Sequence, residues 1–215
     1  MTPKLVPPED FPEKPVSRGE ARRAAFLEAV MQVFLEQGYE AASVNEVVRR
    51  AGGSLATLYS QYGNKDGLFS AVLEHGNSRF VEPMSQAADP DLPIEQGLQQ
   101  IGETFLARIV SPDGLAFFRM VVGDGRKFPA TLQQFLRTGP ERVRLTVAAY
   151  LAARADQDGC VFEDAEEAAG YFCEMVRGRH QYRALSDASY ALNETQISAY
   201  VTRAVRFFLA GARKR

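Results

Sequence analysis

Apolar residues recur along this chain three and four positions apart, the spacing that places them on one face of an α-helix. The pattern is clearest over residues 43–62, where two short apolar stripes flank a glycine pair. No segment shows the alternation of apolar and polar residues, bounded by turn signals, that is typical of a β-strand. The sequence therefore predicts an all-α fold. The two stripes consist of Val44, Val47, Val48 and Ala51, and of Leu55, Leu58, Tyr59 and Tyr62.

Glycine, proline and aspartate clusters divide the remaining apolar pattern into further helices. We expect a bend or an end at Pro83 and a break at Gly139-Pro140. Residues 1–16 hold five prolines, which predicts an extended or disordered arm. The alternative is an arm that contacts the backbone or minor groove of DNA. The expected helices cover about residues 17–37, 44–51, 55–62, 65–88, 94–110, 115–123, 130–155, 163–185 and 193–213.

The two short helices have clear start and stop signals. Ser43 and Ser54 stand where N-caps belong, and Gly52 stands where the first helix must end. Two capped helices joined by a glycine turn of three or four residues form a helix-turn-helix. In that motif the second helix enters the major groove of DNA.

Charge offers little general attraction for nucleic acid. The net charge of the chain is −2. Over residues 17–66, six cations face six anions, and non-specific affinity for DNA scales with the phosphates neutralised. We therefore expect modest, salt-sensitive binding that depends on a second subunit and on where the cations lie. The cations are Arg18, Arg22, Arg23, Arg49, Arg50 and Lys65.

Several classes of protein are disfavoured by the sequence. No apolar run approaches the roughly 20 residues of a membrane span, and the N-terminal region has no signal-peptide block, so a cytoplasmic protein is expected. Cys160 and Cys173 fit no metal or redox spacing, and His75 and His180 belong to no catalytic motif. We expect no enzyme, no cofactor, no metal site and no membrane partner.

The central region resembles the TetR/AcrR family of bacterial transcriptional regulators. The resemblance is strongest over residues 26–69 and rests on Phe34, Gly38, Tyr39 and Ser43, followed by Ala51-Gly52-x-Ser54-x-x-Thr57-Leu58-Tyr59-x-x-Tyr62-x-x-Lys65-x-x-Leu68-Phe69. It implies a helix-turn-helix DNA-binding domain over residues 17–64. It also implies a helical ligand-binding and dimerisation domain over residues 65–215.

The resemblance assigns DNA contacts that the residue types support. Ser43 and Ser54 cap helices whose N-terminal amides favour a phosphate, and Lys65 offers a point charge. Ser60 and Gln61 are the best candidates for reading bases, because Gln61 has the geometry to bind adenine through two hydrogen bonds. Tyr59 is the family's usual phosphate contact, although core packing is its alternative role. The expected DNA-binding residues are Ser43, Ser54, Leu55, Thr57, Tyr59, Ser60, Gln61 and Lys65.

Two residues depart from the family pattern. At the position of Gly53, family members usually have an apolar residue whose side chain packs into the three-helix core and anchors the turn. With glycine there, we expect that contact to be lost and the turn to be looser. Leu55 stands where a polar residue is common, and it can press on a thymine methyl group but cannot hydrogen-bond a base. Operator preference therefore cannot be copied from other members of the family.

The last two predicted helices carry apolar stripes, and that of the final helix is wide enough for both a core and a partner. By resemblance, they pair with their copies across a two-fold axis, which suits a palindromic operator. The residues expected at this dimer interface are Phe172, Val176, Tyr200, Val201, Val205 and Phe208.

The regulatory region also predicts a pocket for an apolar or amphipathic effector, with core packing as the alternative role of its aromatic residues. The expected lining residues are Phe105, Arg108, Phe117, Phe118, Phe135, Tyr171, Met175 and Arg179. The predicted function is that of a homodimeric repressor that binds double-stranded operator DNA and is released by a small molecule. An activator and a regulator without a small-molecule ligand remain alternatives.

Overall fold

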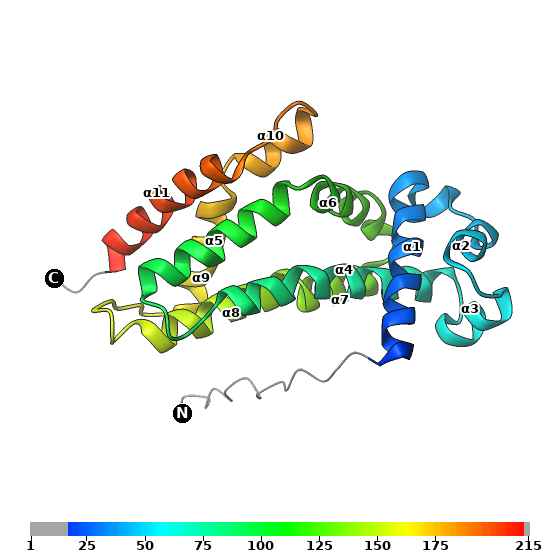
Figure 1. Ribbon diagram of the computed structural model, residues 1–215, viewed down its shortest axis with the longest axis horizontal. Coiled ribbons are helices and arrows are strands. Elements are labelled where there is room, and N and C mark those ends of the chain that lie inside the picture. The colour runs from blue at the N-terminus through cyan, green and yellow to red at the C-terminus, as the bar shows by residue number, and fades with distance from the viewer. Residues whose placement is uncertain (1–16, 213–215) are drawn as a thin grey trace.

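The computed structural model describes residues 17–212, apart from the side chain of Arg126 (Figure 1). These residues form helices and no β-strand, which confirms the predicted all-α fold. The predicted arm over residues 1–16 lies outside the described residues. The helices are α1 (Arg18–Ala41), α2 (Val44–Ala51), α3 (Leu55–Tyr62), α4 (Lys65–Ala87), α5 (Ile94–Val110), α6 (Pro112–Asp124), the short 3-10 helix η1 (Gly125–Lys127), α7 (Pro129–Thr138), α8 (Pro140–Arg154), α9 (Ala165–Arg177), α10 (His180–Ser186) and α11 (Glu194–Ala212).

Helix α1 begins and ends where local chemistry requires. Ser17 and Glu20 form a capping box, in which each side chain accepts a hydrogen bond from the other residue's backbone N–H. Gly38 has φ +75°, outside the helical region, so the helix is interrupted there as predicted. The chain nevertheless resumes helical geometry up to Ala41, beyond the predicted end at Gln37.

Two apolar clusters form the interior of the molecule. The first joins α1, α2, α3 and the start of α4 to Met120 and Val121 of α6. The second lies among α5 to α11, which we call the regulatory end after the domain expected there. It includes Val81 and Met84 from the later part of α4. Helix α4 therefore runs through both clusters and links the helix-turn-helix end, at the right of Figure 1, to the regulatory end. Pro83 lies inside this helix, which continues to Ala87.

The regulatory end is a bundle in which α5 packs against α11, and α8 against α9. The expected break at Gly139-Pro140 is present and separates α7 from α8. The single helix expected over residues 163–185 is wrong, because Gly178 ends α9 with φ +45° and the chain restarts as α10. Only glycine suits this position, since a Cβ there would lie 2.2 Å from the Tyr200 hydroxyl oxygen.

Within residues 17–212, no helix combines the length and the apolar character needed to cross a bilayer.

Candidate DNA interface and regulatory cavity

The turn between α2 and α3 is built from glycine geometry and a serine cap. Gly52 and Gly53 have φ values of +77° and +106°, which turn the chain within two residues. Ser54 then caps α3 by accepting a hydrogen bond of 3.1 Å from the Thr57 backbone N–H, and the two hydroxyl oxygens lie 3.0 Å apart. The remaining amides of the first turn of α3 therefore point outward at an exposed helix start, as a phosphate contact requires.

Gly53 does not vacate space in the core. It is exposed, and a Cβ built on it would meet no heavy atom within 4 Å. The expectation that glycine loses a core contact here is therefore wrong for this backbone. The positive φ of the residue is the physical reason, because it directs any side chain into open space and restricts the position to glycine.

The outward face of α3 carries most of the predicted DNA-reading residues. Tyr59 is 47% exposed and Leu55 is 38% exposed, whereas Leu58 on the opposite face is buried at 1%. The exposure of Tyr59 disfavours core packing as its role. Tyr62, in contrast, is partly buried and stacks on the Phe26 ring with centroids 5.9 Å apart. The other exposed residues of this face are Ala56, Thr57, Ser60 and Gln61.

Lys65 lies at the first position of α4 and is held within the molecule. Its Nζ donates a hydrogen bond of 3.1 Å to the Glu40 carbonyl oxygen and lies 4.5 Å from the centre of the Tyr39 ring. An ammonium group has three donors, so two remain for a phosphate. Ser43 is exposed and caps α2 by accepting from the Glu46 backbone N–H at 3.1 Å.

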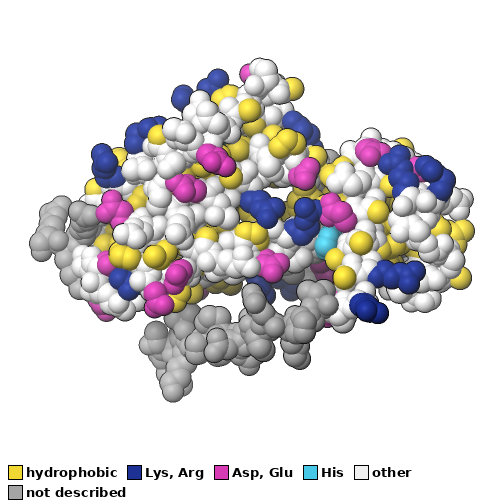
Figure 2. All heavy atoms as spheres, viewed as in Figure 1, with side chains coloured by type: hydrophobic (Ala, Val, Ile, Leu, Met, Phe, Trp, Pro, Cys, Tyr) yellow, Lys and Arg dark blue, Asp and Glu magenta, His cyan; other side chains and the backbone are white. Residues whose placement is uncertain are grey.

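The arginines of α2 are largely neutralised by acidic neighbours. Glu46 accepts from Nε of both Arg49 and Arg50, at 2.8 and 2.7 Å, and Arg50 also pairs with Glu36 of α1. These hydrogen bonds lower the pKa of Glu46 to about 2. Figure 2 shows Lys and Arg side chains gathered at the helix-turn-helix end. Three of the cations counted in the sequence, Arg18, Arg22 and Arg23, are exposed at the start of α1.

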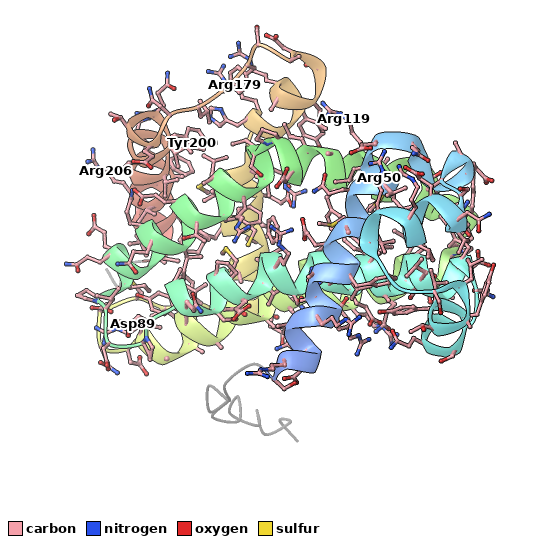
Figure 3. All side chains as sticks on the ribbon, turned by 45° about the vertical axis from the view of Figure 1, so that its right-hand side comes forward. Arg50, Asp89, Arg119, Arg179, Tyr200 and Arg206 are labelled. Carbon is pink, nitrogen blue, oxygen red and sulfur yellow. The ribbon has the colours of Figure 1, made fainter. Side chains whose placement is uncertain are left out.

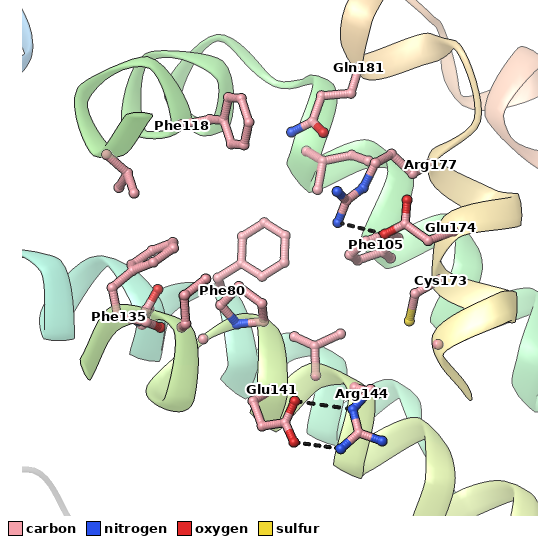
Figure 4. A pocket seen from close by; sticks show the side chains of 18 of the residues that line it. Phe80, Phe105, Phe118, Phe135, Glu141, Arg144, Cys173, Glu174, Arg177 and Gln181 are labelled. Atoms are coloured by element: carbon pink, nitrogen blue, oxygen red, sulfur yellow. Dashed lines mark hydrogen bonds and ion pairs between the residues drawn. The ribbon is translucent and has the colours of Figure 1, made fainter. Parts of the chain in front are cut away.

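The regulatory end contains a large cavity of about 1170 Å³ that is partly open to solvent and is bordered by seven helices from α4 to α10. This volume exceeds the range typical of small-molecule sites, so the cavity has room for a ligand of several rings. Its walls are mainly aromatic and aliphatic (Figure 4). Cys173 also lines the cavity and is half-buried, and desolvation of its thiol raises its pKa to about 12 and leaves it protonated.

Five of the eight expected lining residues do border this cavity: Phe105, Phe117, Phe118, Phe135 and Tyr171. The other three expected residues do not border it. Met175 packs against the regulatory core, Arg179 precedes α10 (Figure 3), and Arg108 belongs to the last turn of α5.

Sequence reasoning missed Phe80, Arg144, Arg177 and Gln181, which also line the cavity. For Arg177 a signal existed, because Gly170, Cys173, Glu174 and Arg177 form one helical stripe on α9.

Comparison with known proteins places the chain in a family. Residues 26–72 match the family described as "Bacterial regulatory proteins, tetR family". Residues 96–211, more than half of the chain, match "AefR-like transcriptional repressor, C-terminal domain". The chain belongs to the TetR family. It is therefore a transcriptional regulator rather than an enzyme.

Curated relatives of this TetR-family protein include both repressors and activators. The transcriptional repressor ComR of Escherichia coli is 42% identical over 68 residues, which cover 30% of this chain and 32% of the relative. The transcriptional activator FasR of Mycolicibacterium smegmatis is 34% identical over 84 residues, covering 39% and 38%. The chain thus matches about a third of the length of either relative.

Solved structures of the TetR family match the whole fold. A TetR-family regulator from Mesorhizobium loti has a TM-score of 0.84 at 20% identity, covering 92% of this chain and all of that one. The flavonoid-responsive regulator FrrA has a TM-score of 0.71 at 26% identity, covering 91% and 98%.

The apolar stripes expected to form the TetR-type dimer interface are enclosed by their own protomer. Phe172, Val176, Val201 and Val205 are at most 1% exposed, so their side chains cannot touch a second copy in this arrangement. The physical reason is that α9 and α11 pack these faces against α5 and against each other.

The other two residues expected at the interface also have partners within the protomer. The Tyr200 hydroxyl donates to the Met175 carbonyl oxygen at 2.8 Å. The Phe208 ring lies between those of Phe162 and Phe172.

A junction connects the cavity wall to the DNA-binding end. Helix α6 supplies Phe117 and Phe118 to the cavity, and its last residue, Asp124, accepts a hydrogen bond of 3.2 Å from the Tyr39 backbone N–H. The Tyr39 hydroxyl in turn donates to Asp66 at the start of α4. Burial and this carboxylate raise the pKa of Tyr39, so its hydroxyl stays protonated as a donor.

Proposed function

We propose that this protein is a dimeric, ligand-responsive repressor that binds a palindromic operator and is released when a small molecule enters its cavity. The observation that carries the proposal is that one helix, α6, both lines the cavity and contacts the DNA-binding end through Asp124 and Tyr39. A ligand that binds one position of α6 better than another shifts the population of the helix-turn-helix accordingly.

The proposed DNA contacts follow from the exposed face of α3. Gln61 and Ser60 read bases, Leu55 presses on a thymine methyl group, and Tyr59 contacts the backbone. Ser43, Ser54, Thr57 and Lys65 contact phosphates. Because the helix-turn-helix region carries no excess positive charge, one copy contributes little affinity and two half-sites must be bound together.

The surface proposed for dimerisation is the outward face of α11. Phe207 on this face is 75% exposed, and Val161, whose backbone N–H donates to the Ala212 carbonyl oxygen, is 54% exposed. Exposed apolar side chains mark an interface between subunits where they form one contiguous patch. Two-fold pairing through α11 would suit an operator whose half-sites lie about 34–36 Å apart.

A regulator without a ligand is the second candidate, and the cavity disfavours it. A cavity of about 1170 Å³ with a mainly apolar wall is the kind of site that small-molecule ligands occupy. The flavonoid-responsive relative also supports an aromatic effector. Activation rather than repression remains an outcome of the test, since an activator is among the relatives.

The test is a gel-shift titration against DNA from upstream of the protein's own gene. We expect a salt-sensitive band that resists unrelated competitor DNA and contains two copies of the chain. Transcription in vitro from the same DNA distinguishes repression from activation. Absence of a competitor-resistant band on this DNA and on selected random sequences would contradict the proposal.

A further inference from the structure

One end of the cavity is polar, whereas most of its wall is aromatic. Arg177 of α9 and Gln181 of α10 point into the same space from above Phe105 in the close view (Figure 4). Gln181 is only 5% exposed as a residue and lines the cavity, where its side-chain amide has no hydrogen-bond partner among the described residues. An amide that faces the cavity without a protein partner is available to hydrogen-bond a ligand group there.

Arg177 also has a hydrogen-bond donor without a partner among the described residues, its buried Nε. One terminal nitrogen lies 3.4 Å from a carboxylate oxygen of Glu174, whose side chain is 65% exposed, and the guanidinium carbon lies 6.0 Å from the Phe105 ring centre. A guanidinium group offers a planar fork of donors that fits a carboxylate through two parallel hydrogen bonds.

The other charged groups around the cavity are already engaged. Arg144 pairs with Glu141 and Glu166, and its Nη2 lies 2.9 Å from Glu166. Arg137 is exposed and donates to Gln134 at 2.5 Å. Arg177 therefore stands out among the lining cations as the one with a buried donor still free in the described structure.

We propose that the cavity binds a multi-ring aromatic carboxylic acid, with its carboxylate held by Arg177 and Gln181 and its rings packed between Phe80, Phe118 and Phe135. The proposal rests on the ligand-responsive function given above and names the chemical class of the ligand. The anion supplies acceptors to the guanidinium of Arg177, whose side chain is 28% exposed, and to the Gln181 amide, and the rings fill the apolar remainder.

Calorimetric titration of the full chain without DNA tests this class. The probes are biphenyl-4-carboxylate, the neutral biphenyl-4-carboxamide and the cationic biphenyl-4-ylmethylammonium. We expect the carboxylate to bind at least tenfold more tightly than either isostere. Equal or tighter binding of the amide or the ammonium compound, or no binding of the carboxylate, would overturn the proposal.

Three variants locate the effect. Arg177→Met should weaken carboxylate binding at least tenfold and change carboxamide binding less than threefold. Glu174→Gln removes the competing anion at the exposed rim, so it should strengthen carboxylate binding severalfold, whereas a cation-binding cavity would respond in the opposite direction. Arg137→Met removes another lining arginine and should leave the preference unchanged.

The outcome is separable from that of the proposed function. Calorimetry uses no DNA, and the gel shift uses no ligand. Loss of the carboxylate preference together with an intact operator band would refute only the ligand class. An intact preference with no operator band would refute only the regulator. A preference that persists in Arg177→Met would show that another group binds the anion and would also overturn the assignment.

Discussion

Tyr39 and Asp124 are separated by 85 residues in sequence and joined by one hydrogen bond of 3.2 Å. The donor is the backbone N–H just after the interruption of α1 at Gly38, and the acceptor is the side chain that ends α6. Lys127 adds a weaker tie, because its Nζ contacts both Glu40 and Asp124. The DNA-binding end and the cavity wall thus share a polar junction.

Removing the Asp124 carboxylate should weaken this junction. Asp124→Ala leaves the Tyr39 N–H without its acceptor, and an unsatisfied, partly buried donor costs about 1–3 kcal/mol. We expect that loss in urea unfolding, together with faster hydrogen exchange at the Tyr39 amide. Asp113→Ala, at the exposed start of the same helix, is the control and should leave the exchange rate of that amide unchanged. If both variants behave alike, the hydrogen bond contributes nothing to the junction.

The glycine turn predicts opposite effects for two similar substitutions. Gly53→Ala forces a side chain onto φ +106° and should destabilise the protein by about 1–2 kcal/mol. Gly123→Ala lies within α6 with open space around the new methyl group, and should stabilise by about 0.5–1 kcal/mol. Thermal unfolding of both variants checks the signs. A stabilised Gly53→Ala protein would mean that the turn adopts another conformation.

Gln61 should carry much of the sequence discrimination. Gln61→Ala removes a pair of possible hydrogen bonds to adenine, so the preference for operator over mismatched DNA should fall by about 1–3 kcal/mol. The slope of affinity against salt should stay the same, because no phosphate contact is lost. Gln86→Ala, an exposed glutamine on the distant part of α4, serves as the control. Unchanged discrimination in Gln61→Ala would refute the base-reading role.

His180 should make the protein less stable in mild acid. Burial lowers its pKa, with further lowering from the nearby Arg179, Arg183 and Arg203. The unfolded chain therefore binds a proton near pH 6.5 that the folded chain accepts only at lower pH. Stability from this group is complete above that pH and declines as the pH falls below it.

Melting temperatures at pH 7.5 and 5.0 test this effect. The difference between the two pH values should be smaller in His180→Gln than in the original protein. The value at pH 7.5 serves as the control, since it records the loss of the Tyr190 hydrogen bond and the Tyr200 ring contact alone. An identical difference in both proteins would contradict the prediction.

Local signals in the sequence predicted the DNA-binding end well. Caps and stops such as Ser43, Gly52 and Ser54 act within a few residues, so their effect is readable from the chain alone. The backbone conformation of Gly53 could not be predicted, because a family pattern gives the usual residue type at a position and not the φ angle that a different residue adopts there.

The regulatory end was less predictable because its residues meet through tertiary packing. At the break after α9, a side chain on residue 178 would clash with the Tyr200 hydroxyl, which lies 22 positions further along the chain. The apolar stripe of α11 was expected to serve both the core and a partner, yet periodicity marks only which residues are buried and not what covers them. Gln181 faces the cavity because the chain turns after α9, which the sequence pattern did not reveal.

The pairing of Arg49 and Arg50 with Glu46 and Glu36 affects how strongly non-specific chromosomal DNA competes with the operator for this protein. Arginines that are already paired with glutamates release fewer counterions from unrelated DNA, so the non-specific affinity of the protein is lower. Fewer copies are then sequestered away from the true target. The occupied fraction of the operator would then follow the number of protein copies closely, so a small change in the expression of the protein would change that occupancy.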